Sequence, residues 1–84
     1  MKNFTIPQNV AVSDSGFLFL ASTGETFNLN EQGTLIYKML QNGLNNEEIV
    51  NQITAEYEIS SDLFQKDLDD FLHSLKTFGL VKEL

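Results

Sequence analysis

The stretch Thr23-Gly-Glu-Thr-Phe-Asn-Leu-Asn-Glu-Gln-Gly33 joins the two halves of the fold. Within it, Thr26 to Leu29 alternate polar and apolar side chains, which predicts a strand with one buried face and one solvated face. Asn30 follows as a candidate helix N-cap, and Glu31 is well placed near the positive end of that helix. The stretch therefore predicts a strand that runs into a helix without a loop, and it carries no catalytic side chain.

Two further strands precede this stretch. Residues 9–13 form a short β-branched run that ends at the turn signal Asp14-Ser15-Gly16. Residues 17–20 (Phe-Leu-Phe-Leu) are apolar on both faces, so we expect both sides of this strand to be covered and the strand to be central. Residues 22–24 supply a second turn. Two consecutive hairpins predict a three-stranded antiparallel β-meander whose first and third strands are its edges.

Helices are predicted for the remainder of the chain. The helix after Asn30 stops at Asn42-Gly43, and Asn45-x-x-Glu48 resembles a capping box for a helix that starts at Asn45 or Asn46. The expected buried positions of these two helices follow their apolar periodicity. They are Leu35, Ile36, Met39 and Leu40 in the first helix, and Ile49, Val50, Ile53 and Tyr57 in the second.

The third helix is expected from Ser60 or Ser61 to about Phe78, with Gly79 just beyond its end. Its apolar positions cover about half of the helix circumference, more than the arc near 100° that one core needs. They are Leu63, Phe64, Leu68, Phe71, Leu72, Leu75 and Phe78. Two interpretations stay open: the helix is the central packing element, or one flank of it is kept for a partner. The order of elements predicts a single α+β domain over residues 1–84, of winged-helix type.

The composition excludes several function classes. The chain has no cysteine, which removes disulfides and thiolate catalysis. Twelve acidic residues face five Lys and no Arg, a formal net charge of −7 that opposes binding to the phosphates of nucleic acid. No apolar run is long enough to span a bilayer, and the N-terminus lacks the features of a signal peptide. We therefore expect a soluble, cytoplasmic protein that binds neither nucleic acid nor membrane.

No pattern in the sequence indicates catalysis or a cofactor. The one histidine, His73, lies opposite the centre of the apolar arc and should face solvent. Asp67, Asp69 and Asp70 are distributed around one side of the third helix and are expected to form a solvated charged face. The glycine-rich, phosphate-binding and calcium-loop motifs are all missing. We therefore expect no enzyme, no cofactor and no metal site.

The remaining candidate is the edge strand formed by residues 26–29. Edge strands are commonly blunted by Pro or Lys, and Pro7 could blunt the opposite edge, but this segment contains neither residue. An open edge beside a helix with a wide apolar arc suits an extended peptide that binds by β-strand addition. The plain alternative is a short edge that is simply solvated.

The order of these residues resembles the PqqD-like family of small peptide chaperones, which are recognition elements for ribosomally made, modified peptides. The resemblance covers about Val12 to Val81. It is carried by residues 13–16 (Ser-Asp-Ser-Gly), 23–33, 35–37 (Leu-Ile-Tyr), Leu40, 42–43 (Asn-Gly), 47–50 (Glu-Glu-Ile-Val), 56–57 (Glu-Tyr), Asp67, 71–72 (Phe-Leu), Leu75 and 79–80 (Gly-Leu). The family often has an aromatic residue such as Trp at the position of Tyr37.

The resemblance implies that the leader of a precursor peptide pairs with the third strand and packs against the third helix. The residues matched to this site are Thr26, Phe27, Asn28, Leu29, Leu68, Phe71, Leu72 and Leu75. It also implies a non-catalytic role, in which the bound peptide is delivered to a modifying enzyme, often a radical S-adenosylmethionine protein. The alternatives are a winged-helix transcription factor and a structural subunit of a larger complex.

Overall fold

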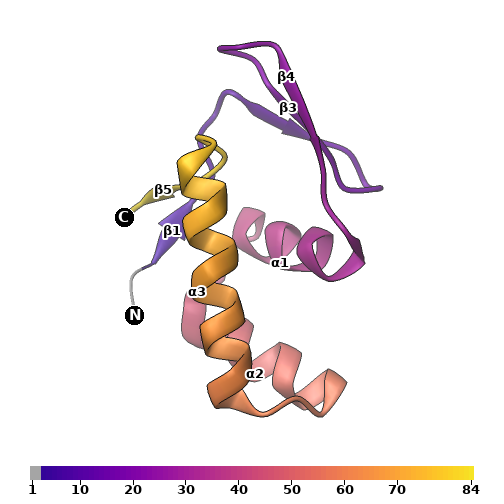
Figure 1. The fold of residues 1–84 in the computed structure, drawn as a ribbon, viewed down its shortest axis with the longest axis vertical. Coiled ribbons are helices and arrows are strands. Elements are labelled where there is room, and N and C mark those ends of the chain that lie inside the picture. The colour runs from indigo at the N-terminus through magenta and orange to yellow at the C-terminus, as the bar shows by residue number, and fades with distance from the viewer. Residues whose placement is uncertain (1–2) are drawn as a thin grey trace.

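The computed structural model describes residues 3–84 and shows a three-stranded sheet followed by three helices (Figure 1). Met1 and Lys2, the first residues of the N-terminus that lacks signal-peptide features, lie outside the described residues. The strands are β1 (Phe4–Thr5), β2 (Val10–Val12), β3 (Phe17–Leu20), β4 (Glu25–Asn28) and β5 (Lys82–Glu83). The helices are α1 (Glu31–Gln41), α2 (Asn46–Tyr57) and α3 (Ser61–Thr77). The predicted α+β order of a meander followed by three helices is confirmed.

The meander has the strand order β2-β3-β4, with both pairs antiparallel. Leu18 and Leu20 point into the core and are buried, whereas Phe17 and Phe19 are each 42% exposed on the opposite face. β3 is therefore the central strand, as predicted, but the prediction that both of its faces are covered is wrong. The helices pack on one face of the sheet, so the other face stays open.

The junction between β4 and α1 is held by close contacts on both sides. Asn30 caps α1 by accepting a 2.7 Å hydrogen bond from the Gly33 N–H. The Leu29 N–H donates to the Gly16 carbonyl at 2.9 Å. Gly16 has φ +88°, and a Cβ there would lie 2.1 Å from Thr34 Oγ1, so this turn requires glycine. These contacts fix the direction in which α1 leaves the sheet.

Helix α2 begins with the predicted capping box at Asn45. The Asn45 side chain accepts from the Glu48 N–H at 2.8 Å, and the Glu48 carboxylate accepts from the Asn45 N–H at 2.9 Å. Tyr57 is 46% exposed, so its predicted burial is wrong. It is the last residue of α2, and Glu58 follows with a left-handed φ of 54°, so the chain turns away before Tyr57 reaches the core.

Segments near the two ends of the chain pair with each other, and no pattern in the sequence predicted this pairing. Phe4 lies opposite Glu83 and Thr5 opposite Lys82 in a two-stranded antiparallel ladder. The adjacent Leu80 is buried, and its carbonyl accepts a 2.9 Å hydrogen bond from the Tyr37 hydroxyl of α1. Burial raises the pKa of Tyr37 to about 12. This bond ties α1 to the segment that follows α3.

Helix α3 supplies a large part of the core and also leaves an apolar flank uncovered. It ends as predicted, with the Gly79 N–H donating to the Lys76 carbonyl at 3.0 Å. Its buried side chains are Phe64, Leu68, Leu72 and Leu75. Leu63 and Phe78 are 65% and 54% exposed, and Phe71 is half-buried. The apolar arc is therefore wider than the part of it that the core covers.

Candidate functional site

The outer edge of β4 has backbone groups that no other strand uses. In residues 3–84, β4 pairs with β3 alone. The Leu29 N–H points inward to Gly16, and hydrogen bonding alternates along an antiparallel strand. The N–H and C=O groups of Thr26 and Asn28 must therefore point outward, while those of Phe27 pair with Leu18. β4 presents two residues that a further strand could join.

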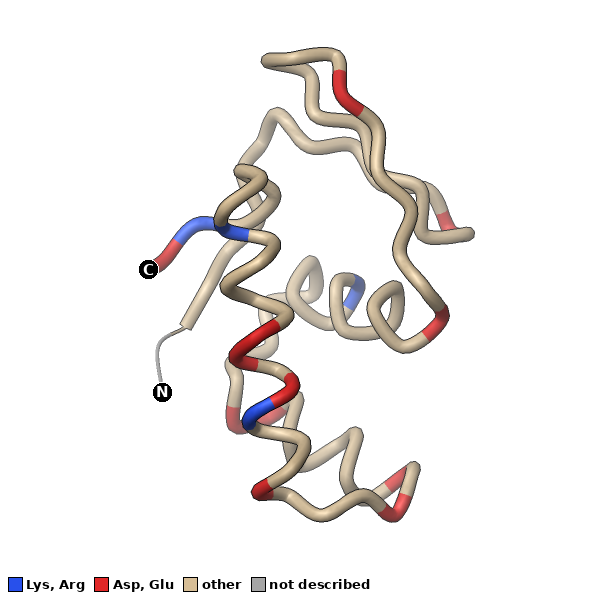
Figure 2. The backbone as a smooth tube through the Cα atoms, viewed as in Figure 1, with Lys and Arg blue, Asp and Glu red and all other residues tan. Residues whose placement is uncertain are grey.

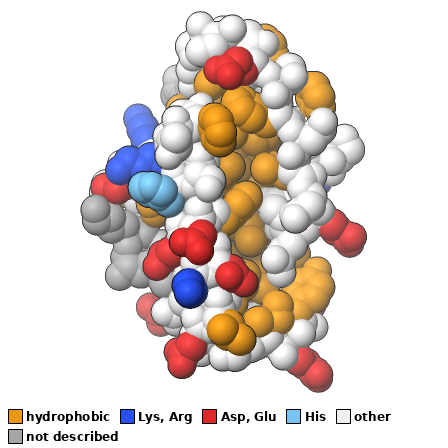
Figure 3. Space-filling view, in the orientation of Figure 1, with side chains coloured by type: hydrophobic (Ala, Val, Ile, Leu, Met, Phe, Trp, Pro, Cys, Tyr) orange, Lys and Arg blue, Asp and Glu red, His pale blue; other side chains and the backbone are white. Residues whose placement is uncertain are grey.

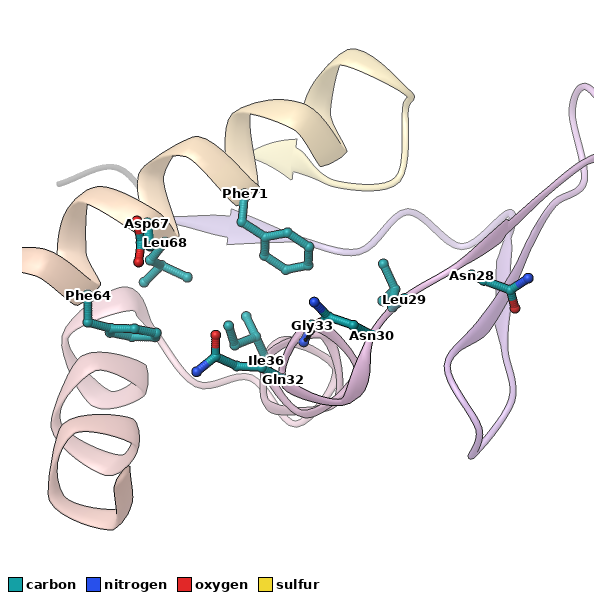
Figure 4. Close-up of a pocket in the computed structure, with 10 residues that line it drawn as sticks. All are labelled: Asn28, Leu29, Asn30, Gln32, Gly33, Ile36, Phe64, Asp67, Leu68 and Phe71. Atoms are coloured by element: carbon teal, nitrogen blue, oxygen red, sulfur yellow. Dashed lines mark hydrogen bonds between the residues drawn. The ribbon is translucent and has the colours of Figure 1, made fainter. Parts of the chain in front are cut away.

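A cavity of about 300 Å³ lies between the end of this strand and α3 (Figure 4). One wall comes from β4 and the start of α1, and the other comes from α3. The first wall is Asn28, Leu29, Asn30, Gln32, Gly33 and Ile36, and the second is Phe64, Asp67, Leu68 and Phe71. In Figure 4 the side chain of Asn28 is directed away from the cavity, whereas that of Phe71 extends towards it.

Gly33 sets how closely the two walls approach. A Cβ at this position would lie 3.2 Å from Phe71 Cζ and 3.1 Å from the capping oxygen of Asn30. A glycine inside a helix costs stability, so its presence in the first turn of α1 indicates that the space is needed. Without a side chain there, the Phe71 ring lies against α1 and forms the middle of the groove wall.

A second aromatic contact closes the other end of the groove. The rings of Phe27 on β4 and Phe78 at the end of α3 have centroids 5.4 Å apart with their planes tilted by 52°. In Figure 3 a strip of apolar side chains runs along the molecule, flanked by the white surface of other side chains and backbone. We call this feature, from Phe27 and Phe78 to the cavity lined by Phe71 and Phe64, the apolar groove.

The eight residues suggested by the resemblance fall into four pairs. Thr26 and Asn28 provide the free edge, and Phe27 and Leu29 are half-buried with their side chains on the core side of β4. Leu68 and Phe71 line the cavity, although Leu68 has no exposed surface. Leu72 and Leu75 are 1% and 4% exposed, so they support the groove wall from beneath.

Other lining residues were not singled out as site residues from the sequence. Phe64 and Ile36 carry the same apolar signal as core residues, so periodicity does not distinguish them. Gly33 does have a signal, because a glycine three residues after an N-cap is an unfavourable choice for a helix. Phe78 could have been found as the apolar residue that lies one step before the Gly79 stop.

The surface around the groove is acidic. Asp62, Asp67, Asp69 and Asp70 are all exposed on α3, and Figure 2 shows acidic residue positions clustered along the backbone of that helix. Lys66 lies among them, whereas Lys76 lies in the last turn of α3 and pairs with Glu83 at 2.7 Å. His73 is exposed, as predicted. Such a face would repel the phosphates of nucleic acid.

Residues 3–84 contain no group of three His, Cys, Asp or Glu side chains placed to hold a metal ion. None of the helices there has the length and apolarity that a bilayer crossing requires.

An unpaired strand edge next to an apolar groove is the arrangement of protein modules that accept an extended peptide as an added strand. The chain belongs to the PqqD family: the model of the family described as coenzyme PQQ synthesis protein D matches residues 16–81. No curated protein matches the chain.

Two solved structures share the fold. One is TbiB1 in complex with the TbiA(beta) leader peptide, with a TM-score of 0.87 and 33% sequence identity over 93% of this chain and 94% of that chain. The other is lasso peptide synthetase B1 complexed with the leader peptide, with a TM-score of 0.85 over 94% and 96% of the two chains. Its identity of 24% supports the shared fold alone.

Proposed function

We propose that this chain is a non-catalytic binding protein that captures the leader of a ribosomal precursor peptide as a fourth strand on β4. The observation that carries the proposal is the position of Asn28, which has outward backbone groups and also lines the cavity. The leader would pair with Thr26 and Asn28 and would place apolar side chains in the groove against Phe71. The bound TbiA(beta) leader in the similar TbiB1 structure supports this assignment.

The expected affinity follows from these contacts. Thr26 and Asn28 together offer up to four main-chain hydrogen bonds, each worth about 1 kcal/mol net. One leader side chain buried in the cavity would add roughly 1.5–3 kcal/mol. Ordering the peptide opposes these gains, and the sequence tolerance of main-chain bonds leaves selection to the groove. These contacts sum to at most about 7 kcal/mol before that cost, so the micromolar or somewhat tighter binding that we expect, near −8 kcal/mol, requires further leader side chains to be buried along the apolar groove.

The acidic residues of the groove wall favour leaders that carry positive charge. Asp67 lines the cavity and is exposed, with Asp70 one turn further along α3. A leader with Lys or Arg near its apolar anchor would be attracted by these carboxylates. Because the carboxylates are exposed, added salt should screen the attraction. We expect binding of a basic leader to weaken between 50 mM and 500 mM salt, measured by titration; an affinity unchanged by salt would contradict this preference.

The binding itself is tested by fluorescence anisotropy with labelled leader peptides encoded by small open reading frames beside the gene. We expect one of them to bind saturably, and its unlabelled form to compete. A scrambled peptide of the same composition is the control for charge and hydrophobicity. If the folded protein bound every such leader no better than its scrambled control, the proposal would be wrong.

Presentation to a modifying enzyme is the second half of the proposal. The chain itself carries no motif for the modification chemistry, so the reaction must come from a partner such as a radical S-adenosylmethionine enzyme. In a reconstituted reaction, we expect the enzyme encoded nearby to modify the precursor faster when this chain is present. Mass spectrometry of the precursor measures the modified fraction. Equal rates with and without the chain would contradict the presentation of the precursor to the enzyme and would leave peptide binding alone as the function.

A further inference from the structure

The outer face of the sheet is uncharged and open, and it carries two exposed aromatic rings. Phe17 and Phe19 lie two residues apart on β3 and are each 42% exposed. The strand register places Ala11 of β2 beside Phe19, and Thr26 and Asn28 of β4 beside Phe19 and Phe17. None of these five residues is charged, in a chain with a formal net charge of −7. Two neighbouring exposed aromatic rings on an uncharged face could contact a partner, and we call this surface the outer face.

This face is continuous with the proposed leader site. A strand added to β4 places its side chains alternately on the two sides of the sheet. Half of them would enter the apolar groove, and the other half would line up next to Thr26 and Asn28 on the outer face. The leader would then widen the outer face by one strand. On the groove side, the leader side chains would lie against α3, whereas those on the outer face would stay open to a further protein.

The area of the face argues against a stable dimer. Three strands about 4.8 Å apart, of three or four residues each, cover on the order of 200 Å². A stable protein–protein interface buries about 800 Å² on each partner. The outer face therefore suits a weak contact that acts together with a second link. An enzyme that holds the modifiable part of the same precursor peptide has such a link, because the peptide tethers it to this chain.

We propose that Phe17 and Phe19 form the docking site for the enzyme that modifies the bound precursor, and that this enzyme contacts both rings together with the leader strand beside them. The inference rests on the proposed leader-binding function. The partner surface it requires is apolar and has no acidic rim, because acidic groups would be repelled by this chain. Docking should be stronger for the leader complex than for the free chain.

The test uses the double variant Phe17→Thr/Phe19→Thr, since threonine favours strands and removes both rings. The control is Tyr57→Thr, which removes an aromatic ring of similar exposure at the end of α2. The double variant should bind the leader within about threefold of wild type, because its changes lie on β3, one strand away from the leader. The rate at which the enzyme encoded beside the gene modifies the precursor should fall at least tenfold, whereas the control should keep its rate.

The outcomes separate this inference from the proposed function. Normal leader binding with an unchanged modification rate would overturn the docking site and leave leader capture intact. Failure of the wild-type chain to bind any leader would overturn both. Sedimentation of the wild type should show a monomer; a dimer that the double variant dissociates would show that a second copy covers the face and would also overturn the proposal. Circular dichroism confirms that each variant is folded.

Discussion

Replacement of Asn28 by proline tests the role of the β4 edge most selectively. Proline removes a backbone donor, and the Asn28 N–H points to solvent rather than to β3. The preceding residue, Phe27, is already extended, as a residue before proline requires. We therefore expect the variant to fold, with a loss of unfolding free energy on the order of 1 kcal/mol.

The cost to leader binding should be larger. The leader carbonyl that faced Asn28 would lose its donor and stay unpaired, at a cost of about 1–3 kcal/mol. That range corresponds to a loss of affinity of roughly 5- to 150-fold. The matched control is Asn28→Thr, which changes the side chain but keeps the N–H and suits a strand; we expect it to bind within about threefold of wild type.

The assay is anisotropy titration of a labelled leader, with urea unfolding of the same samples to establish that each is folded. Binding by folded Asn28→Pro that equals wild type would refute the assignment of this edge. Equal losses in the Pro and Thr variants would show that the side chain, rather than the backbone donor, is what the leader contacts.

Three further predictions concern the groove wall and the frame that holds it. Gly33→Ala should push the Phe71 ring into the open groove, because the new Cβ would lie 3.2 Å from Phe71 Cζ. The midpoint of urea unfolding should hold or rise, since alanine favours a helix by about 1 kcal/mol, while leader affinity should fall. Unchanged leader affinity would contradict this close packing. The folded protein holds the Tyr37 proton more tightly than the unfolded chain, because its pKa is raised to about 12; this stability is complete below pH 10 and declines towards pH 12, by about 2–3 kcal/mol. Tyr37→Phe lacks the titrating hydroxyl that donates to Leu80, so its unfolding free energy should decline less between pH 9 and pH 11.5, and an equal decline would count against the assignment. Asn45→Ala should lower the unfolding free energy by about 1 kcal/mol without changing leader affinity, because it breaks a capping box that lies away from the groove; an unchanged urea midpoint would show that the box contributes nothing.

Features with a local cause could be predicted from the sequence. The Asn30 and Asn45 caps and the Gly79 stop each depend on side chains within a few residues, and the structure has all three. The sheet order followed from two turn signals. The central place of β3 followed as well, because its neighbours in sequence became its neighbours in the sheet.

Features that depend on tertiary packing were missed or misjudged. β1 and β5 have two residues each, which is too short for any periodic signal, and they pair only because the fold brings the chain ends together. Phe17 and Phe19 have the apolar pattern of a strand covered on both faces, yet one face is open. The sequence does not show how many layers will cover a sheet.

In the candidate groove, too, the features with a local cause were predicted and those set by tertiary packing were not. The free edge followed from the absence of Pro and Lys in residues 26–29. The wide apolar arc of α3 indicated a wall, but not which residues of the arc reach the surface. Leu72 and Phe71 are adjacent in the sequence, and a rotation of 100° around the helix makes one buried and the other a wall of the cavity. That rotation is set by packing on α2 and on the sheet.

Amide hydrogen exchange of the labelled domain, followed by NMR with and without a bound leader, tests the central claim most directly. In the free protein, Phe27 and Leu29 should exchange slowly because their N–H groups pair inward, whereas Thr26 and Asn28 should exchange fast. Addition of a leader should slow Thr26 and Asn28 and leave the other two as they were. If a bound leader left Thr26 and Asn28 in fast exchange, the peptide would not be a strand on β4, and the proposed mode of capture would be wrong.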